Sequence, residues 1–406
     1  MRKINTRNFT RATRTTAREV NRQILLNLVR EHQPISRADL ARMMDVGRGM
    51  VTELVNTLIA EGVIHEGATA VAPRGRRPTL LHIRSGDRFV VGVDLRFSRT
   101  YLMLCDFSGR QLALENFEAI TDPKLLVKTL TARVRRLLDA HGAAESCIGV
   151  GVVVGGMVDP RTGRVLNSPQ LGWRNVDFAD DLASALGLHV AVENAPKACA
   201  LAHLWLGPRA GEDSDNFVYV TVSEGVGAGI VLNGQVVRGQ GHTSGEFGHI
   251  PINPDGPICL CGAKGCLEAN TSNLATLARY LGYDFSDPDA RQRLRESRFT
   301  FDDLMARARS GDARAIDAIK QSGHYLGIGL SVIVNGINPA RIYVGGEIAQ
   351  VWDLIADSIA KTVAERALTE QAARTPIIPE PGSDHPRLRG ATALIVAPLF
   401  AAPQIA

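Results

Sequence analysis

Hydrophobic and polar positions follow two different periods along this chain of 406 residues. In the first 60 residues, apolar side chains recur at intervals of three and four, which predicts three helices. The first runs from about 18 to 32, the second begins after Ser36 and the third ends before Gly62. Ser36 stands three residues before Asp39, as an N-cap does before an acid in the first turn. The second helix stops at 45–47, and two short helices joined by such a turn predict a helix-turn-helix.

The outer face of the third helix carries the candidate DNA-reading residues. In helix-turn-helix proteins, the N-terminal part of the second helix meets base edges in the major groove. Arg48 and Asn56 are suited to bidentate contacts with bases. Gly49 either permits a close approach to DNA or weakens the start of the helix. The full candidate set on this helix is Arg48, Gly49, Met50, Thr52 and Asn56.

Two short strands, at 63–66 and 80–83, are predicted after the third helix. The basic segment between them would form the wing of a winged helix, and its Arg-Gly-Arg-Arg-Pro core is similar to an AT-hook that fits a narrow minor groove. The candidate contacts are Arg74, Gly75, Arg76 and Arg77. The alternative is a solvated basic loop. We therefore expect a basic tail at 1–17 and a DNA-binding domain at 18–85.

From Phe89 onward the pattern becomes rich in strands. Short strands, a helix at about 123–141 and an apolar strand at 148–154 are followed by a strand at 190–193 and another helix. A second set begins with the strand 217–222 and ends with a helix at about 314–335 and a strand at 342–344. Because the same order occurs twice, we expect an α/β body at 86–406 with two related lobes, a cleft between them and a C-terminal segment that returns to the first lobe.

The charge is divided unevenly. Residues 1–88 hold 16 Lys and Arg against 8 Asp and Glu, whereas the remainder holds 30 against 34. The basic excess therefore belongs to the N-terminal fifth, which indicates a polyanionic partner for that part. The chain begins without an apolar signal region and has no apolar run of membrane-spanning length, so we expect a cytoplasmic protein with no membrane partner.

A compact group of metal-binding residues lies between 245 and 268. His249 is followed by Cys259, Cys261 and Cys266, which together form a complete tetrahedral set for one structural Zn²⁺ with no open position. Disulfides are a poor alternative, because a Cys-x-Cys pair rarely reaches disulfide geometry. Unligated thiols remain the other alternative.

Several motifs of the body are similar to those of the ROK family of sugar kinases and repressors. The specific ones are Glu-x-Gly-His at 246–249 and the three cysteines followed by Glu268. Gly-Gly-Met-Val-Asp at 155–159, Val-Glu-Asn at 192–194, the glycine turn at 225–229, Asn-Pro at 338–339 and Gly-Gly at 345–346 agree with them. With the helix-turn-helix in front, the whole chain resembles ROK repressors of sugar metabolism, and the resemblance implies a duplicated actin-like, RNase H-like fold.

The same resemblance implies a set of sugar-binding residues around the cleft. They are Gly156, Asn194, Glu246, His249 and Glu268. His249 would then use one ring nitrogen for the metal and the other for the sugar. The alternative is that these polar residues are a hydrogen-bonded structural relic.

Two departures from the kinase pattern predict that the chain is not an enzyme. ROK kinases place an aspartate, the general base, directly after the asparagine that corresponds to Asn194, and here that residue is Ala195. They also place two glycines after the first strand to admit nucleotide phosphates, where this chain has Arg96 and Phe97. Losing both should abolish phosphoryl transfer.

We therefore expect a sugar-responsive DNA-binding regulator, a repressor of carbohydrate metabolism genes, that acts as a homodimer or tetramer on an operator in double-stranded DNA. The first alternative is a surviving ATP-dependent sugar kinase. The second is a repressor whose effector is a protein partner.

Overall fold

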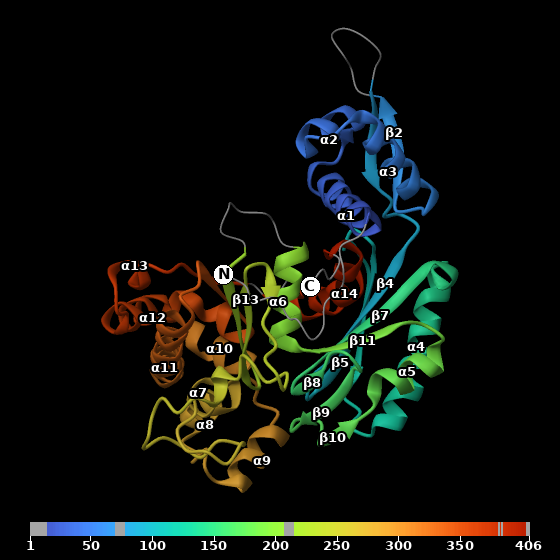
Figure 1. Cartoon of the computed structure of the whole chain (residues 1–406). Coiled ribbons are helices and arrows are strands. Elements are labelled where there is room, and N and C mark those ends of the chain that lie inside the picture. The colour runs from blue at the N-terminus through green and yellow to red at the C-terminus, as the bar shows by residue number, and fades with distance from the viewer. Residues whose placement is uncertain (1–13, 70–77, 207–214, 381, 383–384, 403–406) are drawn as a thin grey trace.

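The computed structural model describes residues 14–69, 78–206, 215–380, 382 and 385–402. The N-terminal head consists of α1 (Arg14–His32), β1 (Ile35–Ser36), α2 (Arg37–Met44), α3 (Arg48–Ala60), β2 (Ile64–Thr69) and β3 (Thr79–Ile83). Its strands form a three-stranded sheet in the order β1-β3-β2. The three predicted helices and the two predicted strands of a winged helix-turn-helix are all present, and they project from one end of the body (Figure 1).

The first lobe of the body is built on a five-stranded sheet. Its strands are β4 (Phe89–Leu95), β5 (Arg99–Asp106), β6 (Gln111–Glu118), β7 (Cys147–Val154) and β11 (Val190–Asn194). Their order is β11-β7-β4-β5-β6, with β4 to β6 antiparallel and with β7 and β11 parallel to their neighbours. Helices α4 (Pro123–Ala140) and α5 (Phe178–Leu186) cover one face. A small sheet of β8 (Met157–Asp159), β9 (Arg164–Ser168) and β10 (Trp173–Val176) precedes α5.

The second lobe repeats this topology. Its strands are β12 (Phe217–Val222), β13 (Val226–Leu232), β14 (Gln235–Val236), β15 (Arg341–Gly345) and β16 (Ile377–Pro379), in the order β14-β13-β12-β15-β16. Again the first three strands are antiparallel, and the last two are parallel to their neighbours. The two sheets therefore have the same strand order and the same directions, and this confirms the predicted duplication.

The remaining helices of the second lobe extend its core. Among them, α11 (Ala313–Ile337) and α12 (Trp352–Arg366) pack on each other and on the sheet. The others are α7 (Leu267–Thr271), α8 (Asn273–Leu281), α9 (Pro288–Glu296), α10 (Phe301–Arg309) and α13 (Glu370–Ala373). Three short 3-10 turns lie at Ala144–Ser146, Phe247–His249 and Glu347–Val351. In the described part of the chain, no helix is long and apolar enough to cross a membrane.

Two helices, α6 (Ala195–Leu206) and α14 (Pro386–Phe400), lie between the lobes (Figure 1). Helix α6 follows β11 of the first lobe but packs on β12 and β13 of the second, where a Cβ at Gly229 would lie 2.3 Å from the Pro196 carbonyl oxygen. Helix α14 follows the second lobe but packs on β4 and β7 of the first. A Cβ at Gly151 would lie 1.7 Å from the Ala391 carbonyl oxygen. Each lobe therefore gives a helix to the other.

The head is joined to the body by a continuous apolar core. Leu25, Val29 and Ile83 of the head belong to the same buried cluster as Ile395 and Phe400 of α14. The packing of the head on the body is thus an extension of the core that seats α14.

The contact between Gly151 and α14 leads to a stability prediction. Gly151→Ala should lower the free energy of unfolding by about 3 kcal/mol, because the new methyl group would collide with helix backbone and not with a flexible side chain. Gly336→Ala is the matched control. Gly336 lies in α11, a Cβ there would meet no atom within 4 Å, and alanine forms helix better than glycine. Thermal and urea unfolding of both variants measure the effect. Equal stabilities of the two variants would contradict the packing described.

Candidate functional site

The candidate DNA-reading face lies on α3 and is exposed. Arg48, Gly49, Met50, Thr52 and Asn56 are all exposed, whereas Val51, Leu54, Val55 and Leu58 are buried. Nothing lies within 4 Å of a Cβ built at Gly49, so this end of the helix presents bare backbone. Asn56 Oδ1 accepts a hydrogen bond from Arg37 Nη2 at 3.2 Å, which orients its amide. The sequence prediction that these side chains share one outward face agrees with the helix geometry.

The turn that presents α3 is fixed by local hydrogen bonds. Ser36 caps α2, with its Oγ accepting the Asp39 N–H at 3.2 Å, while Asp39 Oδ2 accepts the Ser36 N–H at 3.4 Å. Asp45 ends the helix in the left-handed conformation with φ of 50°. The predicted wing residues Arg74, Gly75, Arg76 and Arg77 lie outside the described residues.

The four predicted metal ligands come together in one cluster. The ligand atoms of His249, Cys259, Cys261 and Cys266 all lie within 4.8 Å of one another. The Cys261 and Cys266 sulfurs are 3.7 Å apart, and the Cys259 sulfur is 3.7 Å from His249 Nδ1. A tetrahedron with bonds of about 2.3 Å has edges of about 3.8 Å, close to these two separations, so the donor set suits one tetrahedral metal ion.

Backbone geometry holds this loop closed. Gly265 has φ of +74°, and a Cβ there would lie 1.7 Å from the Asn253 carbonyl oxygen. The Cys259 N–H donates to Ala263 O at 2.8 Å, which forms the tight turn between the ligands. His249 Nδ1 faces the sulfurs, which leaves Nε2 as the ring nitrogen on the other side.

The predicted sugar residues fall on the two sides of the lobe junction. Asn194 and Gly156 lie in the first lobe, where Asn194 Nδ2 donates to Gly156 O at 2.7 Å. Glu268, which follows the metal loop, accepts the Val226 N–H at 2.9 Å. Burial raises the pKa of this carboxyl group. Glu246 lies near the ammonium group of Lys197 on α6.

Gln170 is a polar residue of this junction that the sequence reasoning missed. A Cβ at Gly155 of the first lobe would lie 2.9 Å from Gln170 Oε1, and one at Gly225 of the second would lie 3.5 Å from Gln170 Nε2. The side chain therefore lies between the two lobes, close to Glu268, which a Cβ at Gly225 would also approach at 2.8 Å. Its signal in the sequence is weak, because it stands in a turn without a chemical motif.

Ala195, which the sequence prediction places at the kinase base position, lies in apolar surroundings. Ala195 is 3% exposed and packs with Val153, Ala198 and Ala391. The neighbouring Glu193 is committed elsewhere, because its Oε1 accepts the Asn194 N–H at 2.9 Å and its Oε2 pairs with Arg238 at 2.8 Å.

Lys197, two residues after Ala195 on α6, donates a hydrogen bond from Nζ to the His242 carbonyl oxygen at 2.6 Å. Burial lowers the pKa of this lysine, and the carboxylates of Glu193 and Glu246 oppose that shift.

Charged side chains fill the region after β4, where the kinases carry glycines. Asp94 is fully buried, and its carboxylate accepts from Arg96 Nε at 2.7 Å and from Arg387 Nε at 2.8 Å. Arg96 Nη1 also reaches Glu347 Oε1 of the second lobe at 3.5 Å. Burial raises the pKa of the nearby Glu224, and the carboxylate of Glu347 raises it further. A guanidinium group therefore stands at the position where the sequence comparison expected two glycines in a kinase.

Comparisons with known proteins agree on one family. The model of the ROK family matches residues 90–397. The chain is 27% identical over 389 residues to the xylose repressor of Bacillus subtilis (strain 168), and the match covers 95% of this chain and 97% of that protein. It is also 27% identical over 380 residues to the DNA-binding transcriptional dual regulator NagC of Escherichia coli (strain K12), with 93% and 92% covered.

Two solved structures are similar to this chain, one along nearly its whole length and the other along three quarters of it. A ROK family transcriptional regulator, a homologue of the E. coli MLC protein, aligns with a TM-score of 0.79 at 26% identity, covering 95% of this chain and 97% of that chain. A ROK family glucokinase from Streptomyces griseus, in complex with glucose and AMPPNP, aligns with a TM-score of 0.62 at 26% identity, covering 75% and 98%.

The cap of α2 leads to a prediction on the stability of the head. Ser36→Ala should lower the free energy of unfolding by about 1 kcal/mol at pH 7, because the first turn of α2 loses its side-chain acceptor. The hydrogen bond from Ser36 lowers the pKa of Asp39 in the folded state. Ser36 and Asp39 form a capping box, in which each side chain accepts the backbone N–H of the other residue. Its contribution to the free energy of unfolding is therefore present above the ordinary carboxyl pKa of about 4 and is lost as the pH falls through the lower pKa of the folded state.

Urea unfolding at pH 7 and at pH 3 measures this difference. The gap between Ser36→Ala and wild type should narrow at pH 3, because Asp39 then becomes protonated in part and the box weakens. A gap that widens on acidification would show that the capping box contributes in another way.

Proposed function

The chain belongs to the ROK family, and on that premise we propose that it is a DNA-binding transcriptional repressor whose body senses a sugar. The single observation that carries the proposal is a helix-turn-helix head, with its reading face exposed, joined to a kinase-like body whose base position is the buried Ala195. Similarity along nearly the whole chain to a protein named as a repressor and to two named as transcriptional regulators supports it.

The DNA contacts are assigned to the head. Arg48 and Asn56 read bases from α3, with Gly49, Met50 and Thr52 beside them, because these residues form its exposed N-terminal face. Arg74, Gly75, Arg76 and Arg77 contribute the wing contacts to a minor groove. The partner is an operator in double-stranded DNA, which places the protein in the cytoplasm. The functional division is a basic tail at 1–17, of which the residues from Arg14 onward already belong to α1, a DNA-binding domain at 18–85 and a sensor body at 86–406.

The effector is a sugar or a sugar derivative. Its hydroxyl groups bind Gly156 and Asn194 from the first lobe and Glu246, His249 and Glu268 from the second. One relative is named xylose repressor, and another, from Escherichia coli O6:H1 and 27% identical, is named N-acetylglucosamine repressor, so neutral sugars of that size are the first to test. A ligand that binds residues of both lobes favours one lobe arrangement, and this is the requirement for shifting operator affinity.

Kinase activity is the alternative supported by the similarity to the glucokinase. Two features argue against it. A methyl group at position 195 cannot take the proton of a sugar hydroxyl. The guanidinium of Arg96, paired with Asp94 and Glu347, occupies the region that phosphates would need.

The metal is one structural Zn²⁺ per chain, held by His249, Cys259, Cys261 and Cys266. Three thiolates and one imidazole are the donor set that Zn²⁺ prefers, and four protein ligands leave no open position for catalysis. The metal fixes the His249 ring through Nδ1, so that Nε2 is oriented toward the sugar.

The protein acts as a homodimer or tetramer, because two heads can then bind two half-sites of an operator. A protein effector that competes with the operator is the alternative to a free sugar.

The test is operator binding with a panel of sugars. The full-length protein selects duplexes from a random library, and fluorescence anisotropy then measures affinity for the selected duplex with and without D-xylose, N-acetylglucosamine and D-glucose. Arg48→Ala should weaken specific binding roughly 10- to 100-fold, the equivalent of one bidentate base contact. Lys128→Ala, an exposed lysine of α4 in the body, is the control and should leave it unchanged.

Three outcomes separate the candidates. A sugar that changes operator affinity supports the sensor. No enriched duplex at any salt concentration refutes the repressor. ADP production with ATP and a sugar, in a coupled assay, would establish the kinase instead.

A second prediction concerns the metal. Purified protein should contain about one Zn²⁺ per chain, and Cys261→Ser should lose most of it, because one of four ligands is removed. Cys105→Ser, a buried cysteine of the first lobe far from the cluster in sequence, is the control and should keep the metal. Metal analysis and a thermal-shift comparison measure both. A Cys261→Ser variant that folds, lacks zinc and still responds to the sugar would refute the link between metal and effector.

A further inference from the structure

The head is attached to the body at the C-terminal ends of α6 and α14. Arg30 of α1 donates from Nη1 to Trp205 O at 3.2 Å. Its guanidinium carbon lies 5.0 Å from the Trp205 ring centroid and 4.9 Å from that of Phe400. Asn27, one turn earlier, donates to Phe400 O at 2.8 Å. One side chain, Arg30, thus contacts the last turns of both helices at once.

The opposite ends of the same two helices lie at the lobe junction. Helix α6 begins immediately after Asn194, which belongs to the proposed sugar site. Helix α14 begins with Arg387 in its first turn, whose guanidinium binds Asp94 and also donates to Leu95 O at 3.3 Å. Through Asp94 and Arg96, that end reaches Glu347 of the second lobe.

The two helices are also fixed to each other. A Cβ at Gly390 would lie 2.7 Å from the Ala198 carbonyl carbon, so the backbones are in close contact. Arg389 Nη2 donates to Leu206 O at 2.8 Å. Because closely packed helices deform little, we expect a shift at the lobe junction to reach the helix ends that hold α1.

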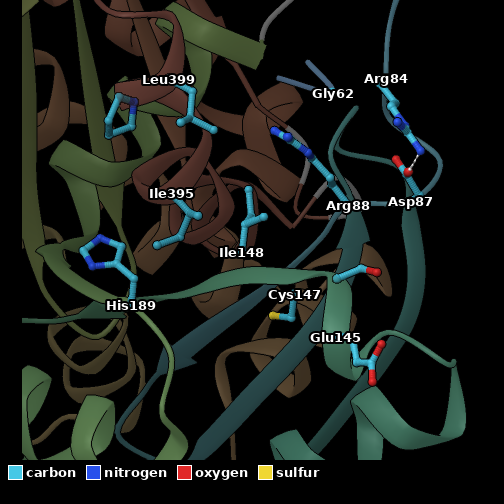
Figure 2. A pocket seen from close by; sticks show the side chains of 12 residues that line it. Gly62, Arg84, Asp87, Arg88, Glu145, Cys147, Ile148, His189, Ile395 and Leu399 are labelled. Carbon is cyan, nitrogen blue, oxygen red and sulfur yellow. Dashed lines mark ion pairs between the residues drawn. The ribbon is translucent and has the colours of Figure 1, made fainter. Parts of the chain in front are cut away.

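Another part of the head–body junction leaves room for such a displacement. An open pocket of about 650 Å³ lies here, lined by Gly62 and Arg84 of the head, by Arg88 directly before β4, and by Ile148 and Leu399 of the body. Figure 2 shows the two arginines on one side of this space and the apolar side chains of the body on the other. This part of the junction is therefore open, whereas the apolar core at Leu25, Val29 and Ile83 and the contacts of Arg30 hold the head on α14.

We propose that α6 and α14 form the relay that carries the state of the lobe junction to the DNA-binding head, and that Arg30 is its coupling residue. This inference rests on the proposed function for its regulatory meaning. Binding at Asn194, or a change in the Arg96–Glu347 contact, moves the helix pair, and Arg30 passes that movement to α1 and so to the orientation of α3.

Hydrogen–deuterium exchange of the full chain tests the relay without DNA or sugar. Glu347→Gln weakens the contact between the lobes at a residue that lies 39 positions before the start of α14 along the chain and still farther from α6. It should change the exchange rates of the α1 amides by about threefold or more, because the helix ends that hold α1 become less fixed. Asp353→Asn is the matched control, since it removes an acid of the same lobe whose partner is Arg309, at 2.7 Å.

The coupling residue is tested by a double variant. In an Arg30→Met background, which keeps an apolar stem but removes the donor, Glu347→Gln should leave the α1 rates where Arg30→Met alone puts them. Unchanged α1 rates in Glu347→Gln, or an equal effect with and without Arg30, would overturn the proposal. If Arg30→Met unfolds the head, seen as full exchange of α2 and α3, the comparison of Glu347→Gln with Asp353→Asn decides alone.

This experiment separates the relay from the proposed function. If the protein binds its operator but α1 does not respond to Glu347→Gln, the relay is overturned and the proposed repressor function stands. A response of α1 in a protein that binds no DNA would support the relay and refute the repressor.

Discussion

The arrangement of this molecule depends on two helices that are exchanged between two sheets. Helix α6 leaves the first lobe and packs on the second, while α14 leaves the second and packs on the first. The exchange is possible because Gly151 and Gly229 let helix backbone approach strand backbone where a methyl group would lie about 2 Å from a carbonyl oxygen. These contacts set the distance between the lobes. They also place Arg387 beside Asp94 and position the surface of α14 on which the head packs.

The same constraint explains how a kinase-like body can serve as a sensor. The start of α6 is where the resemblance to ROK kinases predicts the general base, and the start of α14 lies beside the end of β4. Here the first residue of α6 is Ala195, packed among apolar side chains, and the first turn of α14 supplies Arg387 to a buried aspartate. The scaffold that would orient reactants is kept, but its polar groups bind each other. Binding energy at the junction is then available to shift the lobes rather than to drive a reaction.

The metal cluster and the sugar residues depend on different kinds of information. The four ligands lie within 18 residues of one another, so their spacing alone predicts the site, and the structure gathers them in one place. Gln170 lies far from Gly225 and Glu268 in sequence and meets them only when the lobes come together. Local sites can be predicted from the sequence when the chain between the ligands is short, because few conformations then need to be considered.

The sequence by itself determined the helix-turn-helix with its N-cap at Ser36, the repeated order of strands and the grouping of His249 with three cysteines, and it predicted the loss of the kinase base at Ala195. These depend on periodicity, on short spacings or on a single residue type. Only the tertiary structure decided that Arg96 and Glu347 meet across the lobes, that Glu193 is held by Arg238, and that Arg30 contacts two helix ends at once. Such contacts join residues up to about 370 positions apart, and no local pattern encodes them, because they arise from the way the exchanged helices are packed.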